Sequence, residues 1–122
     1  MNVYLSGPVT GRDYEDACAE FARAAARLRK AGHEVWVPTE NVDARSTREM
    51  AMNVCLRKLT DYRGTDVWAD FKCVARLHLP NVTLVQLPGW TKSAGCRVER
   101  DVALACGIRV VSLEEALGGR NG

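Results

Sequence analysis

The chain has 122 residues, the size of one ordinary domain, and 47% of them are hydrophobic, which is enough for a single core. Its formal net charge of +2 gives no electrostatic case for binding a nucleic acid polymer. No apolar run approaches membrane-spanning length, and the first residues enter a strand pattern without the regions of a signal peptide. We therefore expect one cytoplasmic domain over residues 1–122, with residues 118–122 as a flexible tail.

The cysteine pattern predicts reduced thiols and no zinc site, and we expect neither a metal nor a cofactor. An odd count with irregular spacing argues against a disulfide framework, and no paired short spacing indicates zinc. Cys96 lies in a glycine-rich loop, but a nucleophilic thiol needs a base, and neither His33 nor His78 has an evident reason to lie nearby. The cysteines are Cys18, Cys55, Cys73, Cys96 and Cys106.

The first part of the chain has the pattern of a strand, a glycine loop and a helix. Residues 2–5 form a short strand, and residues 6–11 form a loop with two glycines. Apolar residues at helical spacing predict a helix over residues 14–30, ended by Gly32. This order is typical of a nucleotide-binding α/β domain, although the loop lacks the lysine and the third glycine of the known phosphate-binding fingerprints.

The next part continues the alternation of strands and helices. A second strand is predicted over residues 34–37 and ends at Pro38, and residues 39–45 form a polar connection. The capping-box spacing of Ser46 and Glu49 predicts a helix that starts at Ser46. The buried face of this helix is expected to comprise Met52, Cys55, Leu56 and Leu59.

The last part contains the second glycine-rich loop. A buried strand is predicted over residues 82–87, a helix over residues 98–106, and a fourth strand over residues 108–111. Ser112 and Glu115 have capping-box spacing and open a short final helix. The expected core contacts of the helix over residues 98–106 are Val98, Val102, Ala103 and Cys106.

Strands that alternate with helices predict an α/β fold, a flavodoxin-like or Rossmann-like three-layer sandwich with four or five mostly parallel strands. Right-handed crossovers allow the strand order 2-1-3-4, with a switch point between the first and third strands. That order places the loop at residues 6–11 beside the loop at residues 88–95. Two weak signals therefore converge on one crevice.

Glu99 is the acidic residue nearest to this crevice. It lies about one to two turns into the helix that follows the second loop, close to the positive helix end. A carboxylate there, beside a glycine-rich loop at the carboxyl edge of a strand, is a candidate catalytic group. The alternative is an ordinary solvated glutamate on a surface helix.

With both loops considered, the chain resembles the nucleoside 2-deoxyribosyltransferase-like superfamily, and in particular its small members carried by phages and bacteria. The likeness covers most of the chain and is weakest over residues 41–81. Its paired motifs are fairly specific for the superfamily and poorly specific for the substrate. The residues that carry it are Val3 to Gly11, Ala25, Arg27, Leu28, Gly32 to Val35, Pro38, Glu40, Leu87 to Trp90, Ser93, Gly95, Glu99, Ala103 and Gly107.

The resemblance implies an enzyme that cleaves or transfers the N-glycosidic bond of a nucleoside or nucleoside 5′-monophosphate. The carboxylate of Glu99 attacks the anomeric carbon, Tyr4 orients that carboxylate by a hydrogen bond, and Ser93 with the amides near Gly95 holds the 5′ group. The alternative interpretation gives these residues structural roles only: the Tyr4 ring belongs to the core, Ser93 caps a helix and Trp90 is a packing anchor. The remaining residues expected to contact the substrate are Ser6, Gly7, Val9, Thr10, Gly11 and Trp90.

One departure from the superfamily pattern affects the expected activity. Active relatives carry an aspartate in the helix before the third strand, which is predicted here over residues 66–78. The aligned position falls near Val74 or Ala75, and Asp70, one turn earlier, is the residue able to replace it as a catalytic group. Loss of a general acid costs a factor of about 10² to 10⁴ in rate.

Two other functions remain open for the chain. A catalytically weakened protein on the same fold would sequester or sense a nucleotide, and a structural or protein-interaction domain would bind no ligand at all. The resemblance also implies a homodimer or a dimer of dimers, in which a neighbouring subunit closes the pocket.

Overall fold

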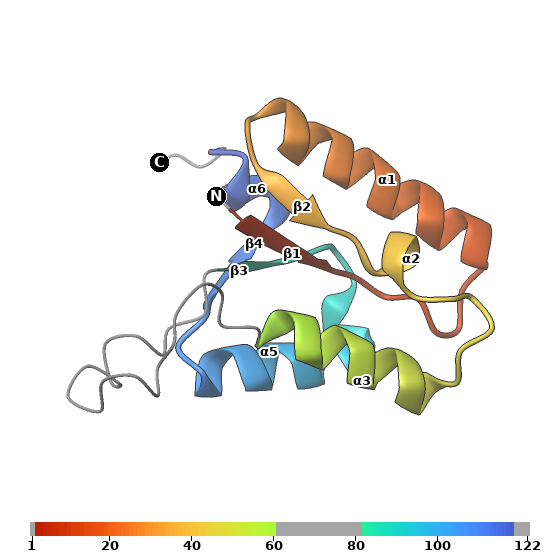
Figure 1. Cartoon of the computed structure of the whole chain (residues 1–122). Coiled ribbons are helices and arrows are strands. Elements are labelled where there is room, and N and C mark those ends of the chain that lie inside the picture. Colours follow the sequence, from red (N-terminus) through yellow and green to blue (C-terminus); the bar gives the residue numbers. More distant parts are fainter. Residues whose placement is uncertain (1, 61–81, 119–122) are drawn as a thin grey trace.

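The computed structural model describes residues 2–60 and 82–118, and its four-stranded sheet is parallel throughout (Figure 1). The strand order is β2-β1-β3-β4, so the predicted α/β class and the order 2-1-3-4 are confirmed. The central strands β1 and β3 lie side by side, as the crevice hypothesis requires. The strands are β1 (Asn2–Ser6), β2 (Glu34–Trp36), β3 (Thr83–Gln86) and β4 (Arg109–Ser112).

Helices cover both faces of the sheet and complete three layers. The helices α1 and α6 pack on one face, whereas α3 and α5 pack on the other (Figure 1). None of the helices in the described ranges is long and apolar enough to cross a membrane. Their bounds are α1 (Tyr14–Lys30), α2 (Pro38–Asn41), α3 (Arg48–Leu59), the 3₁₀ turn η2 (Trp90–Lys92), α5 (Ala94–Ala105) and α6 (Leu113–Ala116).

Strand β1 separates the two layers of the core. Because successive side chains of a strand point to opposite faces, Val3 and Leu5 join the cluster beneath α1. Tyr4 joins the cluster beneath α3 and α5, and Ser6 is fully buried two residues further along. The polar side chains of Tyr4 and Ser6 therefore both face α3 and α5.

Helix α5 begins at Ala94, four residues earlier than predicted. The Ser93 hydroxyl accepts a hydrogen bond from the backbone N–H of Cys96 at 3.3 Å, so the helix is capped inside the loop. The expected core contact of Val98 is wrong, since this side chain is 42% exposed. The buried face of α5 consists of Cys96, Glu99 and Ala103.

Two other boundaries differ from the predictions. Thr47, not Ser46, caps α3, because its hydroxyl accepts from the N–H of Met50 while the N–H of Ser46 is bonded to the carbonyl of Asp43. Pro38 does end β2, but it also opens the short helix α2, a first-turn position that proline favours. The helix expected over residues 66–78 lies outside the described residues.

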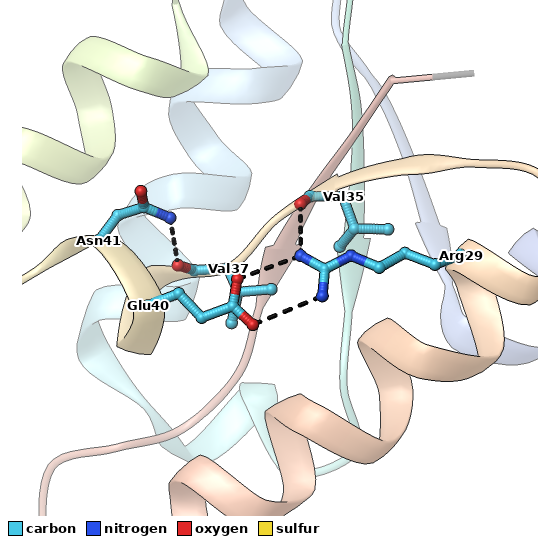
Figure 2. A network of polar contacts seen from close by, with 5 residues as sticks. All are labelled: Arg29, Val35, Val37, Glu40 and Asn41. Atoms are coloured by element: carbon cyan, nitrogen blue, oxygen red, sulfur yellow. Dashed lines mark hydrogen bonds and ion pairs between the residues drawn. The ribbon is translucent and has the colours of Figure 1, made fainter.

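A polar network ties the end of α1 to the start of α2 (Figure 2). The Arg29 guanidinium donates to the carbonyl of Val35 at 3.0 Å and pairs with the carboxylate of Glu40 at 3.1 Å. The Asn41 amide donates to the carbonyl of Val37 at 2.8 Å. An exposed ion pair contributes only about 0–1 kcal/mol, so this network mainly fixes the path of the chain from β2 into α2.

Gly7 is expected to tolerate no side chain. A Cβ atom there would lie 2.9 Å from Leu87 Cδ1 and 3.2 Å from Phe21 Cζ, and both of those side chains are buried in the core. We expect Gly7→Ala to lower the free energy of unfolding by about 1–3 kcal/mol, the usual cost of overpacking. Urea unfolding beside Ala26→Ser, a change on the exposed side of α1, measures the difference. Equal stability of the two variants would show that Leu87 moves aside freely.

Candidate active site

A cavity of about 1060 Å³ opens beside the carboxyl end of β1. The β1–α1 loop, the α2–α3 connection, one side of α3 and the first turns of α5 form its wall. Both glycine-rich loops therefore contribute to one cavity, in agreement with the predicted crevice. Of the residues predicted for the site, those that line it are Gly7, Val9, Thr10, Ser93, Gly95 and Glu99.

The Glu99 carboxylate is held from the sheet by two hydroxyl groups. The Ser6 hydroxyl donates to Oε1 at 2.7 Å, and the Tyr4 hydroxyl donates to Oε2. Glu99 is only 6% exposed, and both donors are fully buried. The hydrogen bond expected between Tyr4 and Glu99 is present, and the alternative of a solvated surface glutamate is wrong.

The Tyr4 ring is itself fixed by its neighbours. It stacks on the ring of Trp36 with a centroid separation of 5.0 Å and an interplanar angle of 20°. The two residues are register partners on β1 and β2, so the strand pairing sets this contact. The stacked, buried ring thus places its hydroxyl beside the Glu99 carboxylate.

Burial governs the charges at this site. Burial raises the pKa of Glu99, and the hydrogen bonds from Tyr4 and Ser6 oppose that rise because they stabilise the carboxylate. Burial and the adjacent Glu99 charge raise the pKa of Tyr4 well above its usual value, so the phenol remains a donor. Among the residues that the structure describes, no lysine, arginine or histidine forms an ion pair with Glu99.

Two buried cysteines, Cys55 and Cys96, lie beside Glu99. Burial raises the pKa of Cys55, on α3, and of Cys96, on α5, so both remain neutral thiols. Cys96, which the sequence places in the site loop, is therefore buried, at 2% exposure. Within residues 2–60 and 82–118, no group of three or more His, Cys, Asp or Glu residues is placed to hold a metal ion.

We expect Glu99→Gln to raise the free energy of unfolding at pH 8. The folded-state pKa of Glu99 lies above its unfolded value, so the folded state favours the protonated carboxyl group. The stability that this protonation contributes is complete below the unfolded pKa and is lost as pH rises through the folded pKa. Glutamine stays neutral throughout. The gain at pH 8 should be on the order of 1 kcal/mol, as for a typical stabilising change.

Urea unfolding of both proteins between pH 4 and pH 8 checks this, and the difference should shrink toward the acid end, near the ordinary glutamate pKa of about 4.3. If Glu99→Gln were less stable than the native protein, and by the same amount at pH 8 as at pH 4, burial would not disfavour the Glu99 charge.

The start of α5 forms a second part of the cavity wall. Ser93 caps the helix, and the first N–H groups of α5 are not needed by bonds within the helix. Lys92 and Arg97 line the cavity on either side of this turn, and Gly95 lies against the Met52 side chain, whose Cε is 3.1 Å from the position of an added Cβ. A positive helix end with adjacent cations can hold an anion.

The other predicted site residues lie elsewhere. Ser6 is bonded to Glu99, and neither Ser6 nor Gly11 is part of the described cavity wall. Trp90 is also outside that wall, and the centroid of its ring lies 4.7 Å from the Arg100 guanidinium carbon. This contact agrees with the interpretation of Trp90 as a packing anchor and not as a substrate contact. Asp70 lies outside the described residues.

Sequence reasoning did not find several residues around Glu99. Trp36 stacks on Tyr4, and Cys55 contacts the Tyr4 hydroxyl. Gln86 is buried at the end of β3 and bonded to α5. The alternation along β1 was a usable signal for Ser6, because Ser6 shares a strand face with Tyr4. The others depend on strand register and helix packing.

A family model described as a domain of unknown function (DUF1937) matches residues 1–115. No curated protein matches the chain. The match covers most of the 122 residues, so the chain belongs to the DUF1937 family.

Proposed function

We propose that this member of the DUF1937 family cleaves or transfers the N-glycosidic bond of a nucleoside or nucleoside 5′-monophosphate, with Glu99 as the nucleophile. The observation that carries the proposal is a buried carboxylate in a cavity wall, bonded to two hydroxyls and to no cation among the described residues. Burying such a charge is costly, and folds retain costly polar groups mainly where they function.

The unpaired charge suits the chemistry of glycoside cleavage. The transition state carries positive charge at the anomeric carbon, and a carboxylate without a competing cation stabilises it. An oxygen of Glu99 then bonds to C1′ while the C1′–N bond breaks and its electron pair leaves with the base. Water or a second base attacks C1′ in turn, which breaks the ester and restores the carboxylate.

The hydroxyls of Tyr4 and Ser6 serve to hold this carboxylate in one orientation. An attack on C1′ requires the oxygen to approach in line with the departing base, and a fixed donor pair reduces the search for that geometry. The Tyr4 ring stays in place because it is stacked on Trp36. Both donors remain protonated and neutral, so they leave the negative charge on Glu99.

The remainder of the cavity fits the rest of a nucleotide. Lys92, Ser93 and the first N–H groups of α5 offer a site for a 5′-phosphate or 5′-hydroxyl. Apolar side chains provide a wall against which a flat base can pack. The ones that line the cavity include Val9, Tyr14, Phe21, Val42 and Met52.

Incubation with a panel of nucleosides and nucleoside 5′-monophosphates tests the proposal. Chromatography should detect free base from at least one member of the panel, and addition of a second free base should reveal transfer. A preparation that releases no base from any of them would end the catalytic proposal.

A nucleotide-binding protein without turnover is the second candidate. Burial raises the pKa of Glu99, and this favours the second candidate because less of the carboxyl group is then ionised for attack on C1′. The cavity and the start of α5 would bind a nucleotide equally well. Native mass spectrometry should then show a retained, uncleaved nucleotide, and no thermal shift with any nucleotide would count against binding.

The homodimer stays a prediction that sedimentation velocity can check.

A further inference from the structure

Gln86 is a buried polar residue at the carboxyl end of β3, directly beside the candidate site. It is 3% exposed, and its register partner on β1 is Ser6. Register partners in a parallel sheet point to the same face, so the Gln86 side chain faces α5 as Ser6 does. The reaction proposed above assigns it no part.

The amide of Gln86 contacts α5 on both sides of Glu99. Its Nε2 donates to the carbonyl of Cys96 at 3.0 Å, and its Oε1 accepts from Nη1 of Arg100 at 3.2 Å. Cys96 precedes Glu99 by three residues and Arg100 follows it by one. A single side chain of the sheet therefore fixes the helix just before and just after the carboxylate-bearing residue.

Arg100 also contacts η2, the 3₁₀ turn that precedes α5. Its guanidinium carbon lies 4.7 Å from the centroid of the Trp90 ring, which belongs to η2. A guanidinium stacked on an indole face is held by a cation–π attraction of about 0.5–2 kcal/mol. Trp90, Arg100 and Gln86 thus join η2, α5 and β3 into one unit.

We infer that Gln86 is a positioning residue that holds α5 at the depth where the Glu99 carboxylate meets the hydroxyls of Tyr4 and Ser6. The inference rests on the proposed glycosidic function for its kinetic consequence. A displacement of about 1 Å at a reacting group can cost a factor of about 10² in rate, even when the altered residue does not touch the substrate.

Gln86→Met removes both hydrogen bonds and retains a side chain of similar length and volume. For a nucleotide that the native protein turns over, we expect kcat to fall by about 10²-fold with KM changed by less than about threefold, because Gln86 does not reach the cavity. Gln86→Glu, which keeps an acceptor for Arg100, should lose less. Leu104→Gln, at a position on α5 that is 56% exposed, is the control and should change neither constant.

A second readout does not require turnover. Urea unfolding from pH 4 to pH 8 compares Glu99 with Glu99→Gln, first with Gln86 present and then with Gln86→Met. Among the described residues, the titratable groups that face Glu99 are Tyr4, Cys55 and Cys96, and all of them stay in both backgrounds. If α5 shifts, Glu99 becomes less buried, and the pH-dependent stability difference should become smaller in the Gln86→Met background.

The two readouts separate failure of this inference from failure of the proposed function. A native protein that turns over no nucleotide ends the proposed function, and the stability difference alone then decides: a smaller difference in Gln86→Met supports positioning, and an unchanged one overturns it. Where turnover exists, an unchanged kcat overturns the inference. A lower kcat with an unchanged stability difference also overturns it, because Glu99 would then lie where it did before.

Discussion

Replacing Glu99 with glutamine is expected to lower the rate of base release by about 10⁴-fold or more. Glutamine has the same shape and can still meet the hydroxyls of Tyr4 and Ser6. Its neutral amide, however, can neither bond to C1′ nor stabilise the positive charge that develops there. Chromatography of free base over time measures the loss, and circular dichroism shows that the variant is folded.

A matched control and a covalent intermediate sharpen this experiment. Glu114→Gln makes the same chemical change at an exposed position on α6 and should leave turnover unchanged. Mass spectrometry of the native protein mixed with substrate should detect a sugar or sugar phosphate on the peptide that contains Glu99. Equal turnover by Glu99→Gln and the native protein would remove Glu99 from the reaction and leave only ligand binding to test.

The order of the sheet could be predicted because it depends on features that are local in the sequence. Four apolar runs separated by helical patterns require parallel pairing, and the fixed hand of crossovers leaves few strand orders. Helix α1 was predicted with its observed bounds, since apolar side chains such as Phe21 and Leu28 recur along one face and Gly32 ends the pattern. The capping box of Ser112 and Glu115 is also present.

The start of α5 could not be placed in the same way. The residues of the loop, including Gly95, disfavour a helix, so local propensity places the boundary near Val98. The structure begins the helix at Ala94 because Ser93 caps it and because Cys96 and Glu99 then face the sheet. The Ser93 cap, which the sequence does offer, and the tertiary contacts of Cys96 and Glu99 together decide this boundary against the low helix propensity of the loop.

The candidate site was predictable at the level of residues and not of contacts. The pairing of the two loops located Glu99, and the resemblance supplied its partner Tyr4. That Ser6 binds the other carboxylate oxygen, and that Gln86 contacts α5 around Glu99, depends on the register of β1 with β3 and on the rotation of the helix. Neither quantity is encoded in any short segment of the chain.

Tyr4→Phe is expected to lower kcat by about 10² to 10³-fold, the usual cost of removing one fixed hydrogen-bond donor from a catalytic charge. The phenylalanine ring retains the stacking contact with Trp36, so the fold should be preserved. What is lost is the hydroxyl that donates to Oε2 of Glu99. The carboxylate then keeps only the bond from Ser6 and is free to rotate away from the anomeric carbon.

The same substitution should move the acid limb of the pH profile, which distinguishes a catalytic role of Tyr4 from a purely structural one. The Tyr4 hydrogen bond lowers the pKa of Glu99 against the larger effect of burial, so its removal raises that pKa further. A nucleophile must be ionised, and kcat/KM therefore falls off at a higher pH in Tyr4→Phe than in the native protein. Ser6→Ala should shift the limb in the same direction, because it removes the other hydrogen bond to the carboxylate. An acid limb that stays in place in Tyr4→Phe while kcat falls would mean that the hydroxyl acts on the substrate and not on Glu99.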